Sequence, residues 1–184
     1  MTERRYSGEI ERLRSAERVA RLEIDRVVDL SLTEPSLQSF LDIGTGSGLF
    51  AEAFSAKGLK VSGVDLREDM LEAARHYVPE GDFRQSHMET LPFPDETFDL
   101  VFMGLVLHEA DNLANALNEA YRVVRQRVMI LEWPYEQGEF GPPLEHRLRS
   151  ETVLDTARQV GFKAVEQIGL KHLTLFRLEK VQRS

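Results

Sequence analysis

The chain has 184 residues, and its 31 acidic against 23 basic side chains give a formal net charge of −8 at pH 7. This length suits one domain with a full core, so residues 1–184 are expected to form a single domain without membrane spans. The acidic balance argues against broad nucleic-acid binding, and the absence of cysteine excludes disulfides, thiolate metal sites and cysteine nucleophiles.

The first thirty residues are expected to be a helical N-terminal segment. Residues 2–14 are highly charged, and their helical pattern is weak. Because no apolar stretch follows them, we expect no secretory signal and a cytoplasmic location. Ser15 has the character of an N-cap, and the apolar spacing after it predicts one helix to about Leu30. Pro35-Ser36 should interrupt the chain before the first strand. Tyr6 and its charged neighbours could fold over the site as a lid, or form a solvated segment.

Strands and helices then alternate until the end of the chain. The expected strands are 39–43, 60–65, 82–86, 98–103, 127–133, 163–168 and 172–179. Helices are expected after the glycine loop at 44–48, after Asp65, after Asp111 and after Ser150. Asp111 and Ser150 are candidate N-caps of the helices that they precede. Alternation of this kind predicts a doubly wound, mostly parallel α/β sheet of seven strands, and Gly169-Leu170 joins the last two as an antiparallel hairpin.

The stretch from Phe40 to Phe50 is the most informative part of the sequence. It predicts a buried strand that enters a glycine loop and then a helix, an arrangement that lets a nucleotide-like ligand approach the backbone. The dinucleotide fingerprint would require a third glycine at position 49, which is Leu49. Asp42 is unfavourable beside a pyrophosphate but suits an ammonium group. The loop therefore favours an adenosyl amino acid over a nicotinamide dinucleotide.

A second acid follows at a distance typical of ribose recognition. Asp65 ends the second expected strand, about twenty residues after the loop, where a carboxylate can accept bonds from both ribose hydroxyls. A helix cap is the alternative role for Asp65.

Four stretches together resemble class I S-adenosylmethionine-dependent methyltransferases of the small-molecule branch that includes the ubiquinone and menaquinone biosynthesis enzymes. They are Leu41–Gly48, Gly63–Leu66, Glu89–Val101 and Leu107–Glu109, within a resemblance that covers about residues 38–179. The resemblance implies a Rossmann-like fold, with S-adenosylmethionine as donor and S-adenosylhomocysteine as product.

The resemblance also implies which residues hold the donor. The implied contacts are Asp42 to the amino group, Gly44, Thr45, Gly46, Ser47 and Gly48 to the methionine and ribose parts, Asp65 to the ribose, Leu66 and Met88 to the adenine, and Met103 to the region of the sulfonium. His87 stands where relatives usually carry an Asp that binds the adenine amino group. His87 could accept that bond only as a neutral imidazole, and an exposed loop histidine is the alternative. No metal is expected.

No single residue is distinguished as a catalytic base. Methyl transfer to an acceptor without a proton needs only alignment, whereas a protonated acceptor needs a base. The candidates are His108, Glu132 at the end of the fifth strand, and His146 in the loop that should wall the acceptor pocket. For His108, a structural role at the start of a helix is the alternative.

The sequence thus predicts a methyltransferase that acts on a small organic acceptor by in-line displacement. A protein that binds S-adenosylmethionine without turnover is the second hypothesis. The chain has little spare length to cover the acceptor, so the pocket could be shallow, built for a small acceptor or completed by a second subunit of a homodimer.

Overall fold

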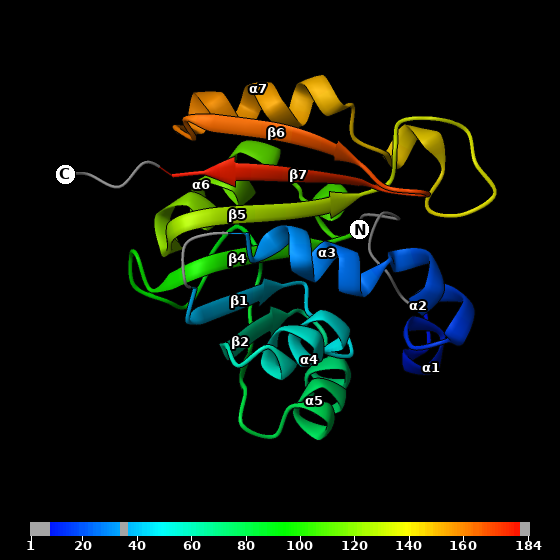
Figure 1. Cartoon of the computed structure of the whole chain (residues 1–184), viewed down its shortest axis with the longest axis vertical. Coiled ribbons are helices and arrows are strands. Elements are labelled where there is room, and N and C mark those ends of the chain that lie inside the picture. Colours follow the sequence, from blue (N-terminus) through cyan, green and yellow to red (C-terminus); the bar gives the residue numbers. More distant parts are fainter. Residues whose placement is uncertain (1–7, 34–36, 181–184) are drawn as a thin grey trace.

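The computed structural model describes residues 8–33 and 37–180, which contain one seven-stranded sheet with helices on both faces (Figure 1). The strands are β1 (Ser39–Ile43), β2 (Lys60–Asp65), β3 (Asp82–Gln85), β4 (Phe98–Gly104), β5 (Val124–Glu132), β6 (Ala164–Gly169) and β7 (Thr174–Glu179). Their order is β3-β2-β1-β4-β5-β7-β6. β1 to β5 are parallel, and β7 runs antiparallel to both β5 and β6. The predicted fold class is confirmed.

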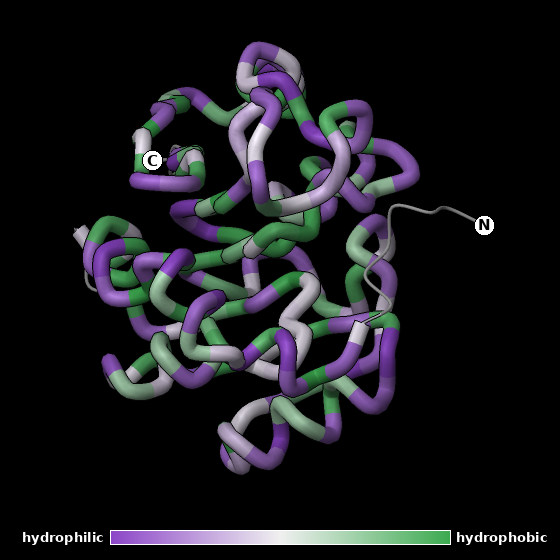
Figure 2. Tube along the Cα trace, turned by 90° about the vertical axis from the view of Figure 1, so that its right-hand side faces the viewer, coloured by the Kyte–Doolittle hydropathy of each residue, from purple (hydrophilic) through white to green (hydrophobic). Residues whose placement is uncertain are grey.

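The helices divide between the two faces of the sheet. α3 (Ile24–Ser31), α4 (Leu49–Ala56) and α5 (Glu68–Tyr77) contribute to one core, and α6 (Leu113–Val123) and α7 (Ser150–Val160) to the other. Because successive strand residues point to opposite faces, Phe40 packs in the first core and its neighbour Leu41 in the second. Figure 2 shows the hydrophobic segments gathered in the interior of the molecule.

The sheet has its topological switch point between β1 and β4. From β1 the chain continues outward to β2 and β3, and from β4 it continues in the opposite direction to β5. A crevice forms beyond the carboxyl ends of the strands at such a point. Ile43 and Met103 are register partners at those ends, so the loops that follow them face the same crevice.

The N-terminal helical segment differs from its prediction. α1 (Ile10–Leu13) and α2 (Ala16–Leu22) precede α3, and Ser15 caps α2 by accepting a bond from Arg18 N. The expected continuous helix to Leu30 is wrong, because Glu23 adopts a left-handed conformation (φ 48°) between α2 and α3. Its carboxylate accepts a bond from Lys171 N at 2.7 Å, a distant contact that helps to hold this break and that sequence periodicity cannot reveal. Tyr6 and Pro35-Ser36 lie outside the described residues.

Three boundaries of the later elements also moved. Asn112, and not Asp111, caps α6, since its side chain accepts a bond from Asn115 N at 3.0 Å. Ser150 is the first residue of α7 and Arg149 occupies the cap position. α6 passes directly into β5, so Val124 already pairs with Phe98 and the strand begins three residues before the predicted Arg127.

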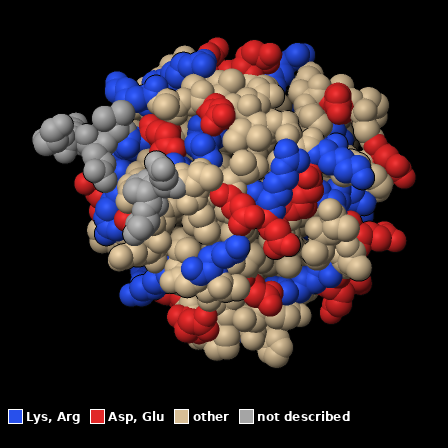
Figure 3. Space-filling model, in the orientation of Figure 1, with Lys and Arg blue, Asp and Glu red and all other residues tan. Residues whose placement is uncertain are grey.

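Two further observations concern the surface. Across residues 8–33 and 37–180, every helix is too short or too polar to traverse a bilayer. On the face drawn in Figure 3, acidic and basic side chains are interspersed.

Candidate active site

A cavity of about 650 Å³ lies at the carboxyl ends of β1, β2 and β4. Three groups of residues line it: the strand ends and their loops, the N-terminal helices α1 and α2, and the segment that follows β5. The lining includes Asp42, Gly44, Thr45, Gly46, Ser47, Asp65, Gly104, His108, Arg12, Arg18, Arg21, Trp133 and Phe140. Of the predicted donor residues, the cavity therefore brings together Gly44, Thr45, Gly46 and Ser47 of the glycine loop and the two acids Asp42 and Asp65.

The glycine loop has a shape that side chains cannot adopt. Gly44 has φ +70°, and a Cβ there would stand 2.4 Å from the Val106 side chain, which follows β4. Gly48 has φ +76°, and its Cβ would stand 2.9 Å from the backbone of Ala74 in α5. Glycine is required at both positions because the conformation is left-handed and the space is filled. The tight turn holds the loop's backbone against the cavity.

Asp42 is a buried carboxyl at the base of the cavity. It is 2% exposed, and Thr45 Oγ1 donates a hydrogen bond to its Oδ2 at 2.9 Å. The pKa of Asp42 is raised to about 7, chiefly by burial and also by the nearby Asp65 carboxylate, against the opposing effect of the hydrogen bond from Thr45. A cationic group beside Asp42 would stabilise the charged form. The site thus suits an ammonium-bearing ligand.

Asp65 is held at the end of β2 by backbone donors. Gly46 N donates to its Oδ2 at 2.9 Å and Arg67 N to its Oδ1 at 3.0 Å. Burial raises the pKa of Asp65 in spite of these bonds. A carboxylate has about four lone-pair sites, so each oxygen can still accept a hydroxyl. This fixed orientation fits the ribose role expected for Asp65.

Ser47 supplies a further polar group without an internal role. Its Oγ is buried in the wall of the cavity and has no hydrogen-bond partner among the described residues. A buried hydroxyl in this state is costly unless a ligand or water bonds to it. The hydroxyl, the two acids and the glycine backbone together fit S-adenosylmethionine, which carries an ammonium, a carboxylate and a ribose.

Other predicted donor residues lie outside the cavity lining. Leu66 is 39% exposed at the surface, whereas Met88 and Met103 are buried in the hydrophobic core. His87 is partly exposed, with Nδ1 accepting a bond from Glu89 N at 3.3 Å and Nε2 lying 3.7 Å from Asp111. Gly48 begins α4 behind the loop. The adenine contacts implied for these residues remain predictions.

Two of the three candidate bases form a buried pair. Nδ1 of His108 lies 2.9 Å from Glu132 Oε2, and the His108 backbone N–H donates to Glu132 Oε1 at 3.0 Å. Burial alone lowers the pKa of His108, but the charge and hydrogen bond of Glu132 outweigh it and the pKa is raised. Since Glu132 engages Nδ1, Nε2 is the ring nitrogen left for the cavity that His108 lines. His146, the third candidate, lies outside that lining, in the short helix η2 (Leu144–His146).

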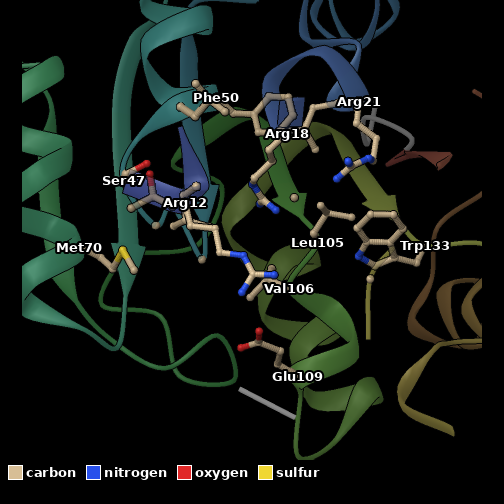
Figure 4. Close-up of a pocket in the computed structure, with 18 of the residues that line it drawn as sticks. Arg12, Arg18, Arg21, Ser47, Phe50, Met70, Leu105, Val106, Glu109 and Trp133 are labelled. Carbon is tan, nitrogen blue, oxygen red and sulfur yellow. The ribbon is translucent and has the colours of Figure 1, made fainter. Parts of the chain in front are cut away.

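The N-terminal helices form a wall of the cavity, whereas the sequence offered a lid only as one of two alternatives for the charged N-terminal segment. Figure 4 shows Arg12 of α1 and Arg18 and Arg21 of α2 extending into the cavity. α1 lies over the glycine loop, where a Cβ on Gly46 would stand 3.3 Å from Leu13. Arg14 fixes this position by donating to Ser47 O at 2.9 Å and to Glu52 at 2.7 Å. Only the spacing of Arg18 and Arg21, three residues apart on one helix, could have indicated a shared face.

The opposite wall is the loop 133–142 after β5. Arg147 is buried beneath it and donates to the backbone carbonyls of four loop residues: Pro134, Glu136, Phe140 and Pro142. The loop closes against Trp133, because Gly141 has φ +89° and its Cβ would stand 2.6 Å from the indole. Arg147 therefore determines where Trp133 and Phe140 meet the cavity.

Comparison with known proteins identifies the family. Residues 41–131, from β1 to β5, match the family described as "Methyltransferase domain". This central segment of the chain belongs to the methyltransferase-domain family. The resemblance to class I S-adenosylmethionine-dependent methyltransferases of small molecules is confirmed.

Curated methyltransferases share this central segment. A malonyl-[acyl-carrier protein] O-methyltransferase from Serratia marcescens is 33% identical over 107 residues, which are 58% of this chain and 42% of that protein. A demethylmenaquinone methyltransferase from Chlorobaculum parvum is 36% identical over 86 residues, which are 46% of this chain and 36% of that protein. The chain thus matches less than half the length of these relatives.

A solved structure extends the likeness to nearly the whole fold. A SAM-dependent methyltransferase from Aquifex aeolicus superimposes with a TM-score of 0.80, covering 94% of this chain and 97% of its own, at 24% identity. At this identity the likeness establishes the shared fold. The shared fold therefore includes α7, β6 and β7 as well as the segment that matches in sequence.

Proposed function

We propose that the chain is an S-adenosylmethionine-dependent methyltransferase, a single domain that transfers a methyl group to a small organic acceptor and yields S-adenosylhomocysteine. One observation carries the proposal: a single cavity is lined by the glycine loop, Asp42 and Asp65 and also by His108, which pairs with the buried Glu132 behind it. A donor held by the first group would share the cavity with an acceptor that reaches the second.

The residues around the glycine loop would hold the donor. Asp42 would receive its ammonium group, Asp65 its ribose hydroxyls, and Ser47 Oγ with the loop backbone its carboxylate. When bound, the donor supplies a methyl group on sulfonium: the acceptor's lone pair bonds to the methyl carbon and the carbon–sulfur bond electrons return to sulfur. Alignment in a closed cavity can contribute about 7–11 kcal/mol to such a displacement.

His108 would act on an acceptor that carries a proton. Its Nε2 can take that proton as the methyl group transfers, while Glu132 fixes the ring and stabilises the imidazolium that forms. Because the pKa of His108 is raised, the neutral form that acts as base increases as pH rises through that pKa. Glu132 has the role of a positioning residue, since its oxygens engage the ring and backbone of His108.

The named relatives support the substrate class without fixing the acceptor. One is named for O-methylation of malonyl-[acyl-carrier protein] and the other for demethylmenaquinone. The family match includes the glycine loop, whereas the N-terminal helices lie outside it. The acceptor of this chain should therefore be sought among small organic molecules, with the remaining walls of the cavity as guide.

Native mass spectrometry and titration calorimetry test the donor site, and release of S-adenosylhomocysteine tests turnover. We expect S-adenosylmethionine to bind the wild-type protein and Asp65→Ala to weaken it at least about tenfold, because a charged hydrogen-bond acceptor is lost. No binding would overturn the proposal. Binding without turnover over a broad acceptor panel would favour the second hypothesis, a binding protein. The cytoplasmic location and the homodimer expected from sequence remain predictions for fractionation and light scattering.

A further inference from the structure

The acceptor half of the cavity contains guanidinium groups that the donor site does not use. Arg18 and Arg21 line the cavity from α2, three residues apart and therefore on the same face of the helix. In Figure 4 both side chains extend from α2 into the same space, on the side of Leu105 and Trp133 rather than of Met70. Both residues are half-buried, so their charges are less screened than those of a surface arginine.

Arg21 is positioned by an aromatic contact and not by an acid. Its Cζ lies 3.5 Å from the centroid of the Phe140 ring, in the loop that Arg147 organises. In the described part of the chain, no carboxylate lies within ion-pair distance of Arg21, whereas Arg26 on α3 pairs with Glu23 at 3.0 Å. Stacking orients a guanidinium plane while its N–H groups stay available for a ligand.

Besides Asp42 and Asp65, three further acids line the cavity and bear on its charge. Glu17 and Glu139 are exposed at the rim, where water screens them, and Glu109 is half-buried beside His108. The walls between them are apolar and include Leu105, Trp133 and Pro142. Arg18 and Arg21 therefore place positive charge beside these apolar walls.

From this arrangement we propose that Arg18 and Arg21 recognise an anionic group, a carboxylate or a phosphate, on the methyl acceptor. The acceptor is an organic anion with an apolar body that lies against Trp133 and Phe140, and with a separate O–H or N–H that reaches His108. Arginine suits this role because its planar fork binds both carboxylate and phosphate oxygens in pairs. The proposal rests on the proposed function and adds the chemical class of the substrate.

The test compares charged and neutral probes on protein loaded with S-adenosylhomocysteine. The pairs are a hydroxybenzoate against the corresponding hydroxybenzamide, and a hydroxyphenyl phosphate against methoxyphenol. Calorimetry should show the anionic member of at least one pair binding about tenfold or more tightly than the neutral member, the effect expected of a charge-assisted hydrogen-bonded pair. The pair that shows the preference distinguishes a carboxylate from a phosphate.

Two double variants separate this site from general charge. In R18Q/R21Q the preference should fall to about threefold or less, as expected once the charged bonds are lost. The control R26Q/R158Q removes two exposed arginines outside the cavity and should keep the wild-type preference. Should R18Q/R21Q fail to fold, R18K/R21K keeps the charges without the planar fork and should still lose preference by about threefold.

The affinity for S-adenosylmethionine is measured in parallel and separates the two proposals. Loss of donor binding in the wild-type protein would overturn the proposed function itself. Normal donor binding with equal affinity for charged and neutral probes, or with no anion bound at millimolar concentration, would overturn only the anionic acceptor. An unchanged preference in R18Q/R21Q would do the same. A larger loss of donor than of probe affinity in R18Q/R21Q would instead assign these arginines to the donor's carboxylate.

Discussion

The two halves of the cavity are built in different ways. The donor half consists of strand ends and one tight loop within residues 42–65, all fixed to the sheet by backbone geometry. The acceptor half is assembled from α2, the loop after β4 and the loop 133–142, which are far apart in the sequence. The first half is defined by main-chain shape and the second by side chains on a helix and two loops. Substitutions in the donor half should therefore cause large losses of donor affinity. Substitutions in the acceptor half should cause smaller, graded changes in acceptor selectivity.

The largest effect is expected in the donor loop. Gly44→Ala places a methyl group 2.4 Å from Val106 in a left-handed backbone, and should reduce S-adenosylmethionine affinity by about a hundredfold or more through loss of the loop's shape. Gly58→Ala is the matched control, because Gly58 has φ +88° with nothing within 4 Å of its Cβ. It should lower stability by about 1 kcal/mol and leave donor affinity unchanged. Equal binding losses in both variants would contradict the distinction.

The next effect concerns the boundary between the halves. His108→Asn should lower kcat by about a hundredfold, as expected for loss of a general base, while S-adenosylmethionine affinity stays within a few-fold. Glu132→Gln removes the charge that raises the pKa of His108, so the rising limb of kcat/KM against pH should move to lower pH. A profile that stays in place would show that the pair has only a structural role.

A smaller effect is expected at Asp42, where the charge of the carboxylate favours donor binding but lowers the stability of the fold. Burial raises the pKa of Asp42 to about 7, so the cost of its charge to folding appears as pH rises from about 4 and is complete above pH 7. Asp42→Asn should therefore raise stability at pH 8 by roughly 1–3 kcal/mol without ligand and weaken donor binding about tenfold.

The pH dependence of donor affinity provides a second measurement on Asp42. The ammonium group favours the charged carboxylate, so wild-type affinity should increase as pH rises through about 7. The same titration with Asp42→Asn should lack this increase, and ionisation of the donor itself is common to both proteins. Parallel curves for the two proteins would contradict the role of Asp42.

The smallest effect is expected in the acceptor wall. Arg147→Lys keeps the charge but cannot reach four carbonyls, so the loop 133–142 should shift and raise the KM for the acceptor by about fivefold, with donor affinity unchanged. Arg149→Lys is the control, since Arg149 is exposed and contacts only the Tyr135 side chain in that loop. A donor affinity that falls together with the acceptor KM would show that the two halves are coupled.

The sequence predicted the donor half better than the acceptor half for a physical reason. Gly44, Asp42 and Asp65 are close in sequence and recur in a spacing that the turn requires, so their meeting could be inferred. The strand boundaries of β1 and β2 were likewise predicted to the residue, because Gly44 directly follows β1 and Gly58 lies just before β2.

The acceptor half depends on contacts that leave no local pattern. The break at Glu23, which separates α2 from α3, is accompanied by a bond to Lys171 at the other end of the chain. The proximity of His108 and Glu132 depends on the pairing of β4 with β5, and both were proposed only as separate candidates. Arg21 is held at the cavity by its contact with the Phe140 ring, and Phe140 lies in a loop that Arg147 shapes. Each of these positions follows from tertiary structure and not from spacing.

The bonding of Arg147 has a consequence for how such a cavity can diversify. All four of its loop partners are main-chain carbonyls, so the path of residues 134–142 depends little on which side chains the loop carries. Substitutions at Glu136, Glu139 or Phe140 could then accumulate while the loop keeps its course. The buried Arg147 guanidinium would keep the loop backbone in place while its side chains, and with them the acceptor preference, change. The positions of His108 and Glu132 would not need to change.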